Sequence, residues 1–188
     1  MAKLYSAVEK GFYDTEIHAN IPEDAVPISD KEYFALMQAQ SAGKIISPDN
    51  NGKPIAADRV FTIAEKKALK KAGIEALRDA KIAAGVPYTF PGGVSGTIQT
   101  RDQRDFRNIT GISVAGLIQF GQDITLKFRD QDDVDHDITP SQAVDLGAFV
   151  MQRVSDIYNA SWRKKDAVEA LSSPDAIDSY DIASDWPV

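Results

Sequence analysis

The chain has 188 residues, of which 43% are apolar and 26% charged, a balance typical of one globular domain or of two small ones. It contains no cysteine, which excludes disulfides, thiolate zinc sites and cysteine nucleophiles, and no apolar run approaches the roughly 20 residues that cross a bilayer. The formal net charge of −7 opposes general binding to phosphate. We therefore expect neither a nucleic-acid partner nor a membrane partner. The first residues lack the apolar core of a signal peptide, so the protein should stay where it is made.

Residues 1–60 are predicted to form a small β-rich module with one helix. Prolines at positions 22 and 27 disfavour helix over residues 3–28, which we expect to be strands and turns. Ser29 and Glu32 have the spacing of a capping box, which predicts a helix that begins there and ends near Gly43. Phe34 and Met37 are expected to face the core of this module.

A β-hairpin is predicted over residues 44–56. The pair Asn51-Gly52 can supply the positive φ angles that a tight hairpin turn needs. Pro54 has no N–H to give to a neighbouring strand, so its arm is expected to be an edge.

Residues 61–85 are predicted to form a basic helix that connects two modules. The segment holds six basic and three acidic side chains, whereas the segments before and after it are acidic. Gly85 and Pro87 end the helical pattern. The basic face could bind an acidic partner, or it could be an ordinary solvated face, which is the commoner case.

Residues 86–171 are predicted to form an α+β domain that ends in a long helix. We expect β-structure over residues 88–129, with the clearest alternation at Ile124 to Arg129. Thr139 and Pro140 have the types found at the cap and first position of a helix, which we expect to run to about Leu171 with Trp162 packed behind it. Residues 172–188 hold four aspartates and no basic residue, and are expected to form an acidic flexible tail.

No pattern in the chain predicts catalysis, a cofactor or a metal site. His18 and His136 are far apart and outside any ligand motif. The acidic turn at residues 130–137 lacks the glycine and the bidentate glutamate of a calcium loop. Gly92 to Gly96 fits neither a phosphate loop nor a nucleophile elbow. We therefore do not expect an enzyme.

Two groups of segments resemble a known family when they are taken together. The first group comprises residues 11–14 (Gly-Phe-Tyr-Asp), 21–33, 43–46 and 51–54, and the second comprises residues 101–104, 109–112, 128–142 and 160–167. The first group resembles the N-terminal module of phage tail-fibre assembly proteins. The second is similar to the C-terminal domain of unknown function that often follows that module.

The resemblance implies a chaperone that helps a tail fibre of a phage, prophage or phage-tail-like particle to fold and trimerise by binding the fibre's distal C-terminal region. Such a protein acts in the cytoplasm of the bacterial host, and some family members remain at the fibre tip. The alternative is therefore a stable minor component of the tip that contributes to receptor contact. The resemblance carries no catalytic residues and leaves a homo-oligomer open.

The candidate partner-binding residues lie mainly in the N-terminal module. Phe12 and Tyr13 are neighbours on one predicted strand and cannot both point inward. The arm with Lys53, Pro54 and Ile55 could accept a fibre strand by β-augmentation. In the tail, Trp186 beside a proline could be an exposed aromatic anchor. We expect the N-terminal module to carry the main contact with the fibre.

Overall fold

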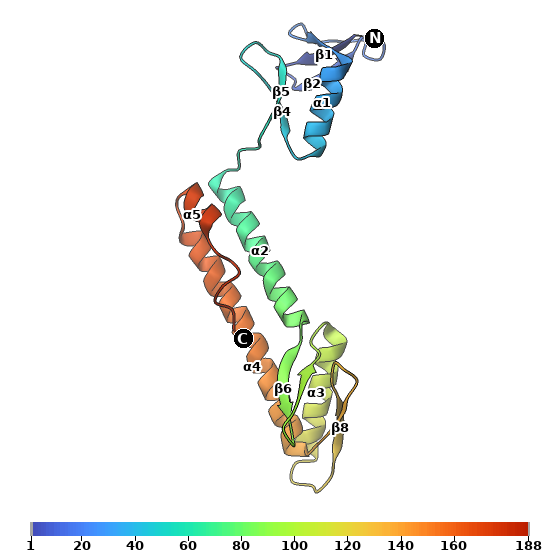
Figure 1. Ribbon diagram of the computed structural model, residues 1–188, viewed down its shortest axis with the longest axis vertical. Coiled ribbons are helices and arrows are strands. Elements are labelled where there is room, and N and C mark those ends of the chain that lie inside the picture. The colour runs from blue at the N-terminus through green and yellow to red at the C-terminus, as the bar shows by residue number, and fades with distance from the viewer. Residues whose placement is uncertain (1, 188) are drawn as a thin grey trace. The chain divides into compact units, whose positions relative to one another are not determined.

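The computed structural model of the protein describes residues 2–187, which form two compact units, one ending at Phe61 and the other beginning at Thr62 (Figure 1). Helices and small antiparallel sheets occur in both units. The predicted α+β class is confirmed. Among the described residues, no helix is both long and apolar enough to span a membrane.

The N-terminal unit begins with a three-stranded sheet in the order β2-β1-β3. Its strands are β1 (Lys3–Ser6), β2 (Gly11–Asp14) and β3 (Val26–Ile28), and both pairings are antiparallel. Tyr5 on the central strand is fully buried. The two outer strands each keep one edge without a strand partner within residues 2–61.

Helix α1 (Asp30–Ser41) packs beside this sheet and begins at the predicted capping box. Ser29 Oγ accepts from the Glu32 N–H at 3.2 Å, and the Glu32 carboxylate accepts from the Ser29 N–H at 2.8 Å. Leu36 is buried, but Phe34 is 64% exposed, so the expectation that Phe34 faces the core was wrong. The core face of α1 follows Tyr33, Leu36 and Met37 at helical spacing, and Phe34 lies about 100° away from Tyr33 around the helix.

The predicted hairpin is present as β4 (Ile45–Pro48) paired antiparallel with β5 (Pro54–Ala57). The Asp49 carboxylate accepts from the N–H groups of Asn51 and Lys53 at 2.8 and 2.9 Å, and Gly52 has a φ of 77°. Of the predicted pair Asn51-Gly52, only Gly52 has a positive φ, and the Asp49 carboxylate supplies the hydrogen bonds that stabilise the turn.

The second unit is built around two long helices, α2 (Ile63–Ala83) and α4 (Pro140–Ala170), which pack along each other. Both begin at capping boxes, at Thr62 and at Thr139. Between them lies an apolar cluster that joins Ile74 of α2 to Ile157, Ala160 and Val168 of α4. The helix expected to be a connector is thus an integral part of the second unit, because its apolar face is covered by α4.

Four of the six basic residues of α2, Lys66, Lys67, Lys71 and Arg78, have acidic partners within the same unit. Lys71 Nζ lies 2.6 Å from the Glu169 carboxylate, Lys66 pairs with Asp178, and Glu75 pairs with Lys165 at 3.0 Å. Much of the basic charge of α2 is therefore paired inside the unit, and Lys70 donates to the backbone carbonyls of Asp178 and Tyr180.

The C-terminal residues expected to be a flexible tail are packed instead. They form a short helix, α5 (Pro174–Ser179), and then run back along the helix pair (Figure 1). Ile177 is fully buried, Trp186 is 8% exposed, and Arg153 donates to the Pro187 carbonyl at 2.7 Å. The segment is held by apolar side chains, although its aspartates suggest exposure to solvent. Ile177 is buried, and Ile182 and Trp186 pack in the apolar cluster with α2 and α4.

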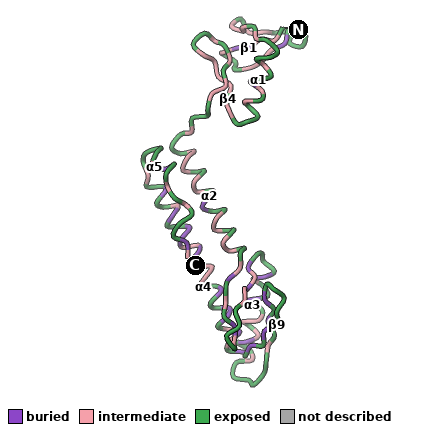
Figure 2. The backbone as a smooth tube through the Cα atoms, in the orientation of Figure 1, coloured by how far each residue is buried: buried purple, intermediate pink, exposed green. Residues whose placement is uncertain are grey.

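The rest of the second unit packs on the N-terminal half of α4. It comprises two hairpins, β6 (Val86–Phe90) with β7 (Val94–Ile98) and β8 (Leu126–Arg129) with β9 (Asp135–Ile138), and helix α3 (Gln103–Ile118) between them. Their apolar side chains form one core with α4, and Figure 2 shows buried positions along both helices. Helix α3 replaces part of the β-structure expected over residues 88–129.

Helix α3 crosses α4 closely because glycines lie at the contact. A Cβ at Gly116 would lie 2.4 Å from the Pro140 carbonyl oxygen, and a Cβ at Gly147 would lie 1.9 Å from Ser113 Oγ. Asp102 caps the helix by accepting from the N–H groups of Arg104 and Asp105. Trp162 is 53% exposed on α4, so the expectation that it packs behind that helix was wrong.

Candidate functional site

A groove in the N-terminal unit lies between α1 and the β4–β5 hairpin. Its volume is about 320 Å³. The lining residues come from α1, the end of β3 and the hairpin: Ile28, Glu32, Ala35, Leu36, Asp49, Lys53, Pro54 and Ile55. The structure thus brings three predicted candidates, Lys53, Pro54 and Ile55, to one wall of one groove.

The lining of this groove includes two acidic side chains, Glu32 and Asp49, and one basic side chain, Lys53. Hydrogen bonds from the Ser29 side chain and backbone hold the pKa of Glu32 below its usual range, and the nearby Lys53 charge acts in the same direction. Glu32 is therefore ionised at neutral pH and is committed to capping α1. The groove combines apolar and charged lining side chains, an arrangement that suits an amphipathic peptide.

The hairpin beside the groove also presents apolar side chains and unpaired strand edges. Ile45 and Ile55 are 42% and 45% exposed, and the register Ile45↔Ala57 and Ser47↔Ile55 places both side chains on one face. Each of the two strands pairs only with the other among the residues that the structure describes. Open edges of this kind are the surfaces on which an additional strand can pair.

Phe12 and Tyr13 lie outside the groove, and both are half-buried. The Phe12 ring packs between Tyr5 and Tyr33, with ring centroids 5.2 and 5.1 Å away. The Tyr13 ring lies 5.3 Å from the His18 ring on the other face of β2. Phe12 thus contributes to the small core of the unit, whereas Tyr13 keeps part of its ring on the surface.

Trp186 is not an exposed anchor, so the expectation that it lies in a mobile tail was wrong. Its indole N–H donates to the Ile182 carbonyl at 2.8 Å, and the ammonium groups of Lys81 and Lys164 each lie 5.7 Å from the ring centroid. The ring is held against α2 and α4, and its role is structural.

The acidic turn is also occupied by structural contacts. The buried Asp130 carboxylate lies 2.9 Å from His136 Nε2 and accepts from the N–H groups of Asp132 and Val134. These hydrogen bonds, of which the one from His136 has the largest effect, hold the pKa of Asp130 below its usual range. Within residues 2–187, no cluster of three or more potential metal ligands is found.

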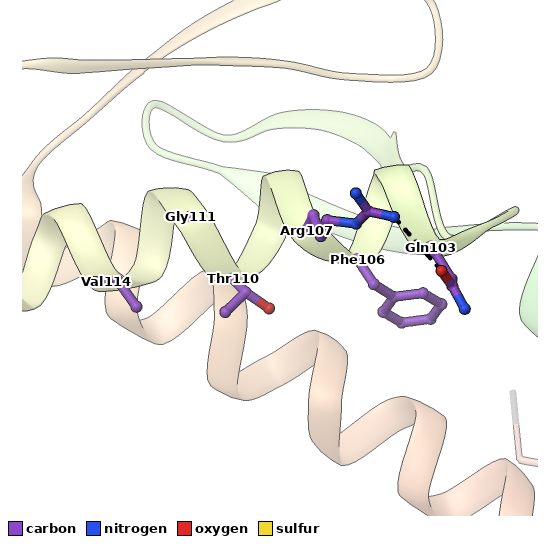
Figure 3. Close-up of a pocket in the computed structure, with 6 residues that line it drawn as sticks. All are labelled: Gln103, Phe106, Arg107, Thr110, Gly111 and Val114. Carbon is purple, nitrogen blue, oxygen red and sulfur yellow. Dashed lines mark hydrogen bonds between the residues drawn. The ribbon is translucent and has the colours of Figure 1, made fainter.

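A second apolar surface, which the sequence reasoning missed, lies on α3. A shallow groove of about 560 Å³ follows Gln103, Phe106, Arg107, Thr110, Gly111 and Val114. Figure 3 shows Phe106, Thr110 and Val114 projecting from the same side of the helix. The signal was present as apolar residues at helical spacing, but the expectation of β-structure concealed it.

The second unit matches a known protein family. Residues 65–184 match the family described as "Domain of unknown function (DUF4376)", and the chain belongs to this family. The match covers nearly the whole second unit, from α2 to the segment after α5.

A relative from Shigella phage SfV, described as "Probable tail fiber assembly protein", is 44% identical over 70 residues. That alignment covers 37% of this chain and 42% of the relative. The resemblance to the tail-fibre assembly family is thereby confirmed. No solved structure matches this chain.

Proposed function

We propose that the protein is a chaperone for a phage tail fibre, which it helps to fold and trimerise by binding the distal C-terminal region of the fibre chain. The observation that carries this proposal is the 44% identity to a phage protein described as a probable tail fiber assembly protein. A binding role also accords with the apolar grooves on the surface of the molecule. No cluster of three or more potential metal ligands is found among residues 2–187.

The groove between α1 and the β4–β5 hairpin is the proposed contact for the fibre. Unassembled chains of a trimeric β-structure expose strand edges and apolar side chains, which aggregate. The open hairpin edge can pair with such a strand, and Ile55 with its neighbours can cover the apolar side chains on one face of it. Release requires only that closure of the trimer buries the same surfaces, so no nucleotide is needed.

Co-expression of the fibre's C-terminal region with variants of the full chain tests this role. Ile55→Glu places a charge in the groove, and Ile17→Glu is the matched control because Ile17 is 77% exposed and outside the groove. We expect Ile55→Glu to reduce soluble trimeric fibre to the level seen without the chaperone, and Ile17→Glu to leave the yield unchanged. A normal yield with a folded Ile55→Glu variant would exclude the groove as the fibre contact.

Purified particles distinguish a chaperone from a tip component. A chaperone that acts only during assembly is absent from mature fibres, whereas a minor tip component is present in fixed proportion to the fibre trimer. Quantitative mass spectrometry of intact particles measures that proportion.

A further inference from the structure

Helix α3 has apolar side chains on two opposite faces, and only one of these faces packs against the rest of the unit. Asp105, Ile109 and Gly116 are buried on the side packed within the unit. On the opposite side, apolar side chains recur at intervals of three and four residues. Their exposed fractions are 45% for Val114, 59% for Leu117, 74% for Ile118 and, just past the helix, 64% for Phe120. A contiguous exposed stripe of this kind marks an interaction surface.

Gly111 lies in the middle of this open face. Glycine inside a helix costs about 1 kcal/mol relative to alanine. At Gly116 the close approach of α4 requires glycine, but a Cβ at Gly111 would meet nothing within 4 Å. Packing within the chain therefore does not account for Gly111, whereas a second helix that crosses closely at this point does.

Exposed arginines outnumber the exposed Asp102 at the N-terminal end of α3, and an exposed aspartate follows its C-terminal end. Arg104 and Arg107 lie at the N-terminal end of α3, and the exposed Asp123 follows its C-terminal end. Over residues 2–187, none of these three side chains forms an ion pair in the chain. A parallel arrangement of two such helices would bring like charges together, whereas an antiparallel arrangement brings Arg104 of one copy towards Asp123 of the other.

We propose that the open face of α3 binds a second copy of the chain, with the two α3 helices antiparallel about a two-fold axis between Gly111 and Val114. The face is self-complementary in this arrangement, because its apolar centre meets itself and each basic end meets an acidic end. The opposed helix dipoles add to the attraction.

The extent of the contact predicts reversible association. The 16 residues of α3 span about 24 Å at 1.5 Å per residue. A contact between two helices of this length is smaller than the roughly 1,600 Å² of a standard stable interface. Dimer formation should therefore depend on concentration in the range from micromolar to millimolar.

Sedimentation velocity of the purified full-length protein over this range tests the proposal without the fibre. We expect a monomer–dimer equilibrium for the unmodified chain. Leu117→Glu should weaken dimer formation by at least tenfold, and its fold can be verified by circular dichroism because Leu117 is exposed in the monomer. A protein that is monomeric at every concentration, or a Leu117→Glu variant that associates normally, overturns the proposal.

A charge-reversal cycle tests the antiparallel arrangement itself. Arg104→Glu and Asp123→Arg should each weaken the dimer several-fold, and the double variant should regain most of the lost affinity. Arg163→Glu is the matched control, since Arg163 is exposed on α4 and away from the open face. Failure of the double variant to recover affinity, or an equal effect of Arg163→Glu, overturns the arrangement. A chain that stays monomeric while Leu117→Glu abolishes fibre solubilisation assigns the face to the fibre instead and also overturns it.

Discussion

Replacement of Trp186 by alanine should destabilise the second unit, although Trp186 lies two residues before the C-terminus. The substitution removes a side chain that is 8% exposed and packs in the cluster shared by α2 and α4. It also removes the indole hydrogen bond to Ile182 and the ring beside Lys164, which is itself 7% exposed. Lys164 would then lose an aromatic neighbour without gaining an anion.

The expected loss is about 3 kcal/mol in the free energy of unfolding. Truncation of a buried tryptophan to alanine costs roughly 3–5 kcal/mol, and the lower end applies here because Trp186 lies in a segment outside helices and strands, which can relax into the space that is left. Urea unfolding followed by circular dichroism measures this loss, because α2 and α4, with 21 and 31 residues, are the longest helices that the structure describes.

Trp162→Ala is the matched control for this experiment. Trp162 is 53% exposed, so its removal should change the free energy of unfolding by less than about 1 kcal/mol. With Trp162 replaced by phenylalanine, the remaining Trp186 fluorescence should be blue-shifted in the native protein. If Trp186→Ala unfolds at the same urea concentration as the parent chain, the C-terminal segment does not stabilise the helix pair and the argument is refuted.

Three further predictions concern local features of each unit. Ser29→Ala should lower the stability of the N-terminal unit by about 1 kcal/mol, measured by hydrogen exchange of the first turn of α1, and unchanged protection there would contradict the capping role. Because the pKa of Asp130 is lowered in the folded state, its contribution to stability should be present above about pH 4 and be lost as the pH falls through the folded value. Asp130→Asn should therefore flatten the acid limb of the stability profile, and an unchanged limb would show that other carboxyls dominate. Gly116→Ala should destabilise the second unit, because the new Cβ would lie 2.4 Å from the Pro140 carbonyl oxygen. Gly111→Ala should stabilise the monomer by up to about 1 kcal/mol, because its Cβ would meet nothing within 4 Å. Thermal melts in which both substitutions shift the melting temperature in the same direction would contradict these helix contacts.

The sequence by itself determined those elements whose signals are local. The capping box at Ser29, the N-cap at Thr139 and the turn that contains Gly52 each satisfy their hydrogen bonds within a few residues, so their positions follow from local sequence. The same locality placed Lys53, Pro54 and Ile55 on a hairpin arm. It could not show that this arm and α1 together form a groove, because that depends on how the two elements pack.

Tertiary structure decided the features that depend on contacts between distant segments. The acidic C-terminal segment has the composition of a flexible tail, yet Ile177 is fully buried, Trp186 joins the apolar cluster shared by α2 and α4, and Asp178 pairs with Lys66. Helix α3 has apolar residues at helical spacing on two faces, so its sequence alone does not show which face is covered. Only the packing of one face against α4, with close approach at Gly116 and Gly147, shows which face is covered and which remains open to a partner.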